Sequence, residues 1–195
     1  GRARVRVTMR AKVKSPPVGT IESWLDLAQL IDELGRQNTN WIFRGVLSTT
    51  YELRPSAGRE GEQVDAAATL KYDVDNERTA LRRFRYDAQP YVRYTPHSDL
   101  EWLAIAQHHG MATRLLDWTE SLLVAAFFAV EQAGSHGEAS IYGVSGLPIL
   151  KPDECNDPFA VDRVYVYRPP HIDTRISAQR SVFTIHPDPT EPFCD

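Results

Sequence analysis

The residues best suited to chemistry are gathered in the stretch QHHGMATRLLDWT. His109 can act as an acid or a base, although a histidine packed into the core is the commoner case. Arg114 can pair with Asp117 or bind an anion. Asp117 or Thr119 can cap the helix expected to follow, because a short oxygen-bearing side chain satisfies free N–H groups. Trp118 offers a flat face to a ring, or it packs in the core.

A second arginine, Arg44, stands at the end of the apolar sequence Trp41-Ile42-Phe43 and is followed by Gly45. Aromatic and β-branched residues favour a strand here. A guanidinium in such an apolar setting must find an anion. It is therefore either half of a structural salt bridge or a clamp for a phosphate or carboxylate, since the guanidinium fork matches both. Gly45 allows a turn or the close approach of a ligand.

Neither the histidines nor the cysteines predict a metal site. His108 and His109 are adjacent, so on a helix they point about 100° apart and cannot share a metal from one face. Cys155 and Cys194 have no metal-ligand or disulfide-framework spacing, which suggests a reducing, cytoplasmic setting. The sequence also contains no Gly-rich phosphate loop, no G-x-S-x-G elbow and no H-E-x-x-H motif. We expect no membrane partner, because no signal peptide or membrane span is visible.

The 195 residues are enough for one large domain or two small ones, and 42% hydrophobic with 25% charged residues is typical of a globular protein. The net charge of −4 is uneven, because residues 1–14 hold six of the 22 basic residues and no acid. We interpret residues 1–19 as a basic arm or an edge strand and residues 20–195 as a single domain. The acidic body argues against a broad nucleic-acid-binding face on the folded part.

The apolar periodicity predicts amphipathic helices over residues 21–34 and 75–88, and the second carries a basic face of arginines. Ser98 predicts the start of another helix and Gly110 its left-handed end. A polar connection then leads to a helix over residues 122–130 that is apolar all round, so we expect it to be central to the core with Phe127 and Phe128 largely buried.

Strands are predicted over residues 41–45, 140–144, 161–167 and 181–186. Helices therefore dominate the first two-thirds of the chain and strands the last third. This order indicates an α+β fold with helices packed on a mixed or antiparallel sheet.

Three segments carry a resemblance to a known family. WIFRG at 41–45, QHHGMATRLLDWTESLLVAAFFAV at 107–130 and RISAQRSVFTIH at 175–186 resemble the FRG domain, which is named for its Phe-Arg-Gly motif. The resemblance covers roughly residues 20–186. It implies a bacterial protein, often associated with phage or with defence against phage.

A second resemblance is to ADP-ribosyltransferases of the Arg-Ser-Glu type. Phe43-Arg44-Gly45 is similar to their first motif, Asp117-Trp118-Thr119 occupies the place of their Ser-Thr-Ser strand, and Gln179-Arg180-Ser181 the place of their Glu-containing turn, although the catalytic Glu is absent. This resemblance implies a cleft that binds a nucleotide-like ligand, with NAD as a substrate. The implied catalytic residues are Arg44, Asp117, His109 and Gln179, and the implied ligand-binding residues are Arg44, Gly45, Arg114, Trp118 and Thr119.

In this hypothesis Arg44 holds phosphate, Trp118 or a tyrosine stacks on a ring, and Asp117 or a histidine supplies acid or base chemistry. The acceptor would be a nucleic acid or a protein. One rival is a non-catalytic interaction module in which the same residues form a polar network. The other is a nucleic-acid-binding domain that uses the basic N-terminal arm.

Overall fold

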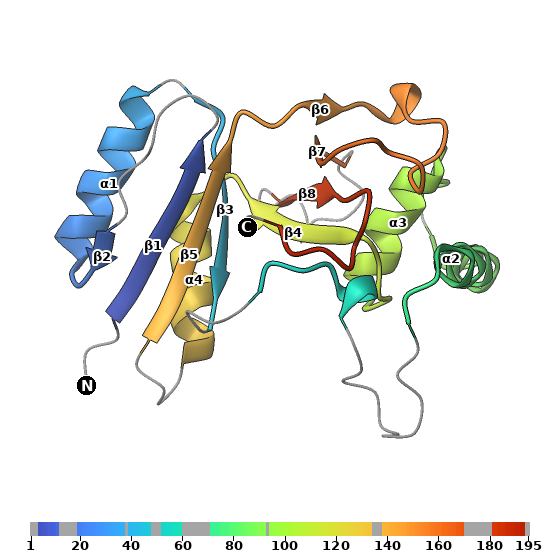
Figure 1. The fold of residues 1–195 in the computed structure, drawn as a ribbon, viewed down its shortest axis with the longest axis horizontal. Helices are drawn as coiled ribbons and strands as arrows, with labels where there is room; N and C mark the ends of the chain where they lie inside the picture. The colour runs from blue at the N-terminus through green and yellow to red at the C-terminus, as the bar shows by residue number, and fades with distance from the viewer. Residues whose placement is uncertain are drawn as a thin grey trace. The chain divides into compact units, whose positions relative to one another are not determined.

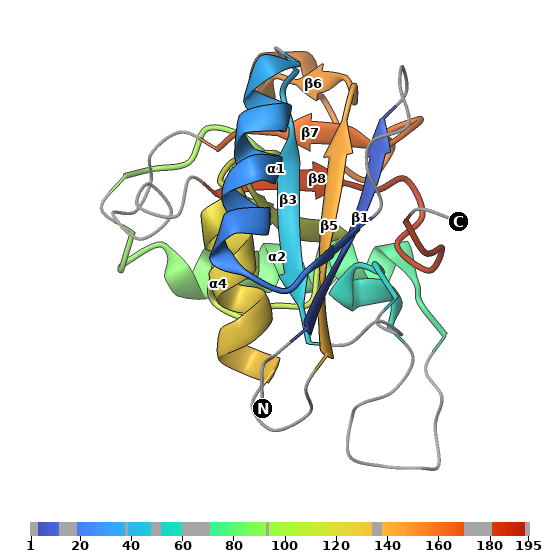
Figure 2. The same cartoon turned by 90° about the vertical axis from the view of Figure 1, so that its left-hand side faces the viewer.

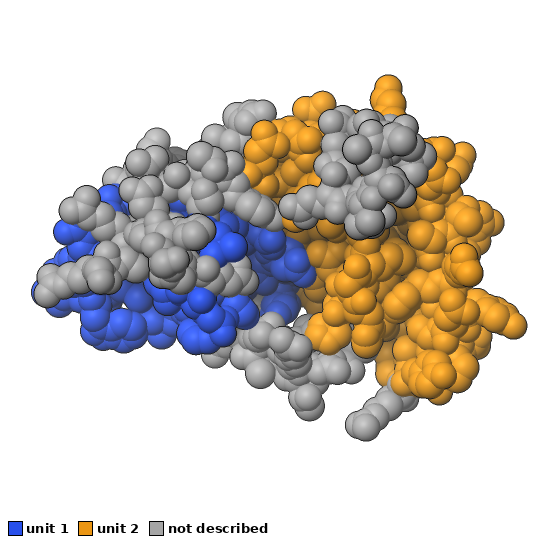
Figure 3. Space-filling view, turned by 90° about the horizontal axis from the view of Figure 1, so that it is seen from below, with its two compact units in different colours: residues 1–51, 117–147, 173–182 blue, residues 52–116, 148–172, 183–195 orange. Residues whose placement is uncertain are grey.

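The computed structural model describes residues 4–11, 19–37, 39–47, 52–59, 71–92, 94–133, 138–169 and 181–193. The chain forms two compact units (Figure 3). Unit 1 comprises residues 1–51, 117–147 and 173–182, and unit 2 comprises residues 52–116, 148–172 and 183–195. Both units are therefore assembled from segments that lie far apart in the sequence.

Unit 1 has a mixed sheet built around β5 (Glu138–Ser145). β5 pairs in parallel with β1 (Arg4–Ala11) and antiparallel with β3 (Ile42–Val46) (Figure 1). On its other side β1 pairs antiparallel with β2 (Gly19–Ile21). Residues 4–11, predicted as a basic arm or an edge strand, thus form a strand with neighbours on both sides.

Two helices pack on the strands of unit 1, α1 (Trp24–Arg36) and α4 (Leu122–Ala133) (Figure 2). α1 begins at a capping box, in which Ser23 Oγ accepts from the Asp26 amide and the Asp26 carboxylate accepts from the Ser23 amide. The helices share one apolar core with β3 and β5, whose buried members are Leu27, Leu34, Trp41, Phe43, Leu122, Ala125, Ala129, Ala139 and Ile141.

The prediction that α4 is buried all round was wrong. Its Leu122, Ala125 and Ala129 side is buried, but Phe127 is 56% exposed, and Phe128 is half-buried. By composition alone, an apolar run of this length fits a fully buried helix as well as a helix that is buried on one side. The small alanines that bring one side close to β3 leave the larger side chains on the other side in water.

Unit 2 contains α2 (Val74–Ala88), α3 (Asp99–His108), β6 (Ile149–Leu150), β7 (Tyr165–Tyr167) and the last three residues of β8 (Ser181–Ile185), with two short 3-10 turns. β7 pairs in parallel with β6 and antiparallel with β8. α3 is the most buried helix, and its side chains form the centre of the second core. That core includes Leu81, Leu100, Trp102, Leu103, Ile105, Leu115, Phe159, Tyr167, Phe183 and Ile185.

The stretch between α3 and α4 is a strand and not the polar connection that we predicted. Gly110 ends the preceding helix with a φ of 86°, as expected. The chain then forms β4 (Leu115–Thr119), which pairs antiparallel with β3 through Thr119 and Phe43. Ser121, and not Asp117 or Thr119, caps α4, because its hydroxyl accepts from the Val124 amide.

The α+β class with a mixed sheet is confirmed in both units. Among the described residues, no helix is long and apolar enough to cross a membrane.

Candidate functional site

Arg44 of β3 and Asp117 of β4 are in contact, close to the Phe43–Thr119 pair that joins the two strands. Arg44 Nη1 donates to the main-chain oxygen of Asp117 at 2.6 Å and lies 3.6 Å from its carboxylate oxygen Oδ2. The Arg44 side chain is 18% exposed, whereas that of Asp117 is 55% exposed. Arg44 Nε is buried and has no hydrogen-bond partner within the described part of the chain. The guanidinium is therefore mostly removed from water but only partly satisfied by the protein.

A tyrosine that we did not single out from the sequence flanks Arg44 on its other side. Tyr142 of β5 is the antiparallel neighbour of Arg44. Directly opposed residues of an antiparallel pair project from the same face of a sheet, so the half-buried Tyr142 ring lies on the Arg44 face. The alternation of the predicted strand over residues 140–144 was the only signal that could have identified it.

Gly45 is required by the packing of α4 on β3. A Cβ atom at this position would lie 2.0 Å from the main-chain oxygen of Ala125 and 2.7 Å from the amide nitrogen of Ala129. Both atoms belong to the backbone of α4, so they cannot give way by a side-chain rotation. The glycine allows α4 to lie directly against β3, and its neighbour Phe43 is buried in the same core.

The other predicted site residues of unit 1 are in the core or outside the described residues. Trp118 is only 3% exposed, so it presents no free face to a ligand. Thr119 is 5% exposed, and its hydroxyl accepts from the Ser121 amide. Gln179 lies outside the residues that the structure describes.

His109 and Arg114 both belong to unit 2. His109 caps the C-terminus of α3 and is exposed, and its ring lies 5.3 Å from that of His108 and 6.2 Å from that of Phe84.

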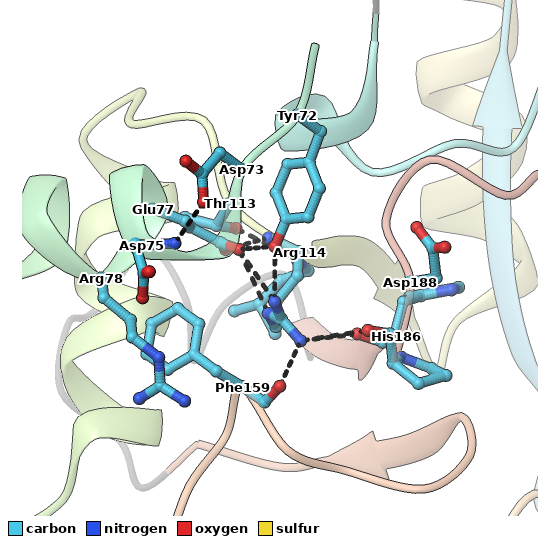
Figure 4. Close-up of polar contacts among 12 residues, drawn as sticks. Tyr72, Asp73, Asp75, Glu77, Arg78, Thr113, Arg114, Phe159, His186 and Asp188 are labelled. Carbon is cyan, nitrogen blue, oxygen red and sulfur yellow. Dashed lines mark hydrogen bonds and ion pairs between the residues drawn. The ribbon is translucent and has the colours of Figure 1, made fainter.

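Arg114 is at the centre of a buried polar network (Figure 4). Its Nε and Nη2 donate to Glu77 Oε2 at 3.2 and 3.1 Å, and its main-chain amide donates to Glu77 Oε1 at 2.8 Å. Nη2 also donates to the Tyr72 hydroxyl, which in turn donates to Glu77. Nη1 donates to the main-chain oxygens of Phe159, His186 and Pro187 at 3.2–3.3 Å.

The Arg114–Glu77 pair is almost completely removed from water, with side-chain exposures of 1% and 3%. Protein groups engage all three guanidinium nitrogens of Arg114, and the ring of Phe159 lies 4.9 Å from its central carbon. Removing two charges from water is costly unless hydrogen bonds satisfy them this fully. The arrangement favours a structural role for Arg114, which ties α2 to the segments around Phe159 and His186.

Glu77 is the member of this network that we missed. It precedes Leu81 by four residues and Phe84 by seven, which places a carboxylate on the apolar side of α2. A charge at such a position is rarely left without a partner. That pattern could have indicated a buried cation elsewhere in the chain.

The network also affects the ionisation of its neighbours. Burial, together with the positive charge of Arg114, lowers the pKa of His186 to about 4. The His186 ring is neutral at pH 7 and shares a hydrogen bond of 2.9 Å with the Thr184 hydroxyl. Burial and the hydrogen bond to Glu77 raise the pKa of the Tyr72 phenol.

Among the described residues, no group of three or more His, Cys, Asp or Glu side chains is arranged to hold a metal ion. The chemistry that the described residues offer is therefore that of a partly satisfied arginine beside an exposed carboxylate and a tyrosine.

The comparison with protein families matches the segment that contains Arg44 and Asp117. The FRG domain matches residues 39–138, which is 100 of the 195 residues and includes β3, β4 and α4. The chain therefore belongs to the FRG domain family, as the Phe43-Arg44-Gly45 motif predicted. Searches of curated proteins and of solved structures gave no match.

Proposed function

We propose that β3 of unit 1 binds a phosphate-bearing, nucleotide-like ligand through Arg44. The observation that carries this proposal is the contrast between the two arginines. Protein groups engage every guanidinium nitrogen of Arg114, whereas Arg44 is mostly buried with an unpaired Nε. A buried cation that is incompletely hydrogen-bonded gains free energy from an anion, and a charge-assisted hydrogen bond contributes about 1.5–3 kcal/mol.

The residues around Arg44 supply the remaining contacts that a nucleotide needs. Tyr142 replaces Trp118 as the ring-binding aromatic residue in this proposal, because Trp118 is in the core. The exposed carboxylate of Asp117 accepts hydrogen bonds from ribose hydroxyls. Gly45 contributes to the site by setting the position of β3 against α4 rather than by touching the ligand.

An extension of this proposal is ADP-ribosyl transfer from NAD. In that reaction an acceptor nucleophile attacks the ribose carbon that bears nicotinamide, nicotinamide leaves with the bonding electrons, and a base takes the acceptor's proton. Asp117 is our candidate for the base, with His109 as the alternative and Gln179 as a further contact. The family resemblance supports a role in bacterial defence against phage, with a nucleic acid or a protein as acceptor, and the low cysteine content supports the cytoplasm as its location.

Calorimetric titration with NAD, ADP-ribose and pyrophosphate tests the binding site. We expect the parent protein to bind ADP-ribose, and Arg44→Gln to weaken binding by at least tenfold. Arg54→Gln is the matched control, because the Arg54 side chain is similarly buried at 24% exposed, pairs with Glu52 and has an unpaired Nε. It should bind like the parent.

A parent protein that gives no heat with any of the three ligands would contradict the proposal. Equal weakening by both arginine variants would indicate a general loss of positive charge rather than a site at Arg44. Release of nicotinamide from NAD, lost in Asp117→Asn, would support transferase activity. Binding without nicotinamide release would limit the function to recognition.

The second candidate function is a non-catalytic interaction module, and a specific observation favours it. Each residue of the Phe-Arg-Gly motif has a packing role, because Phe43 is in the core, Arg44 joins β3 to β4, and Gly45 admits α4. If this is the whole role of the motif, Arg44→Gln should lower the free energy of unfolding without changing any ligand titration.

A further inference from the structure

The outward side of α2 carries two arginines and a tyrosine that the proposed function does not use. α2 buries Glu77 and Leu81 on its inward side. Arg82 and Arg83 precede Tyr86 by four and three residues, so on a helix the two arginines flank the tyrosine ring one turn away. All three side chains are exposed, and Tyr86 is 81% exposed.

These two arginines differ from the others of the same helix in having no carboxylate partner among the described residues. Arg78 pairs with Asp157 at 2.6 Å. Arg85 pairs with Asp99 and lies over the ring of Trp102. In contrast, Arg82 donates a hydrogen bond to the neutral hydroxyl of Thr79. Arg82 and Arg83 therefore leave two positive charges available to a partner.

A second exposed tyrosine follows directly after the helix. Tyr91 is 85% exposed, and its main-chain amide donates to the carbonyl oxygen of Ala88 at 2.9 Å, which fixes its backbone to the last turn of α2. The rings of Tyr86 and Tyr91 both remain in water. Aromatic rings of this kind gain free energy when a planar ring stacks on them.

We infer that the outer face of α2, formed by Arg82, Arg83, Tyr86 and Tyr91, binds single-stranded nucleic acid. Residues 15–195 carry 16 basic against 26 acidic residues, so most of this part of the chain repels a polyanion. The charge of a nucleic acid is therefore complementary to the α2 face but not to the acidic surface around it. Arginines contact the phosphates and tyrosines stack on unpaired bases, which is how proteins bind single strands without reading sequence. Two exposed tyrosine rings favour a single strand over an acidic peptide, which offers carboxylates but no bases.

This face belongs to unit 2 and shares no residue with the Arg44 site, so each proposal can fail without the other. It also differs from binding through the basic N-terminal arm, which uses residues 1–14.

Fluorescence anisotropy with labelled oligothymidine and oligouridine tests the inference. We expect the parent to bind both, and Arg82→Glu with Arg83→Glu to weaken binding by at least tenfold. Losing two phosphate contacts should lower the slope of log K against log salt by about 1.4. Tyr86→Ala should weaken binding by about tenfold, whereas Tyr86→Phe keeps the ring and should bind like the parent.

The matched control is Arg36→Glu with Arg163→Glu, which changes the net charge equally at two other exposed arginines. It should bind almost as well as the parent. Photocrosslinking of an oligonucleotide that contains thiouridine should mark peptides between residues 79 and 94, and this measurement needs no variant to fold.

Three results would overturn the inference. One is the absence of binding by the parent at low salt. Another is equal weakening by the two double variants, which would assign any binding to net charge. The third is a crosslink outside α2 and its following loop, together with unchanged binding by Tyr86→Ala.

Discussion

A methyl group at position 45 would overlap the carbonyl oxygen of Ala125, because the two atoms would be 2.0 Å apart. Gly45→Ala should therefore force α4 away from β3 and lower the free energy of unfolding by about 1–3 kcal/mol or more. A urea titration of the variant beside the parent measures this loss.

Gly35→Ala is the matched control for this substitution, since a Cβ at Gly35 meets nothing within 4 Å. Gly35 lies inside α1, where alanine is favoured over glycine by about 0.5–1 kcal/mol. The two substitutions should move stability in opposite directions. Equal effects would mean that α4 can shift without cost.

Glu77→Gln should be one of the most destabilising single changes in unit 2. It removes the carboxylate but leaves the Arg114 guanidinium buried, and breaking such a pair from one side costs about 3–5 kcal/mol. Asp99→Asn, which breaks the half-exposed pair with Arg85, should cost less than about 1 kcal/mol. Chemical denaturation of both variants provides the measurement. A loss below about 1 kcal/mol for Glu77→Gln would show that Arg114 finds other partners.

His186 should make the protein less stable in mild acid. Its pKa is about 4 when folded and 6.5 in its ordinary state, so between these values the unfolded chain binds more protons. The full stability is present above about pH 6.5, and it falls as the pH is lowered towards 4, by roughly 3 kcal/mol.

Urea titrations at several pH values between 7 and 4 test this expectation in His186→Gln, whose amide can keep the hydrogen bond to Thr184. The variant should lose less stability than the parent over this range. His108→Gln, at an exposed position, should follow the parent. If His186→Gln shows the parent's full pH dependence, another group is responsible.

Phe127 and Phe43 should respond very differently to truncation, although both are large apolar residues of unit 1. Phe43 is 4% exposed, and Phe43→Ala should cost about 3–5 kcal/mol. Phe127 is 56% exposed, and Phe127→Ala should cost less than about 1 kcal/mol. Thermal or urea unfolding of the two variants distinguishes them. A large loss at Phe127 would indicate that its side chain is covered in solution.

Local signals in the sequence were sufficient for several helix ends, although not for the start of α4. Ser23 and Ser98 cap their helices by a contact within the first turn, and Gly110 adopts the left-handed conformation, so no distant residue is needed to predict these ends. Strands β3, β5, β7 and β8 were also predicted to within a few residues, because aromatic and β-branched residues gather in them.

The features that we did not predict correctly depend on partners far away in the chain. β4 contains the sequence Leu-Leu-Asp-Trp-Thr, which looks like a polar connection until β3 is placed beside it. The pairing of Arg114 with Glu77 joins residues 37 positions apart, and the pattern near Asp117 suggested a closer partner. Arg44 and Asp117 were expected to meet, but only through a family resemblance and not through any pattern of spacing.

The position of β5 between β1 and β3 also has a consequence for how the chain folds during synthesis. β1 and β3 pair with β5 and not with each other, so the two strands cannot be joined in one sheet until residues 138–145 have been made. At about 5–20 residues per second the ribosome needs roughly 5–20 s to advance from β3 to the end of β5. Throughout that interval the edge of β3 that pairs with β5 still lacks this partner. The strands that pair with β5 are also far from it in sequence, which predicts slow folding. The long intervening chain must be closed into a loop, at a cost in entropy, before the strand pairing can stabilise the fold.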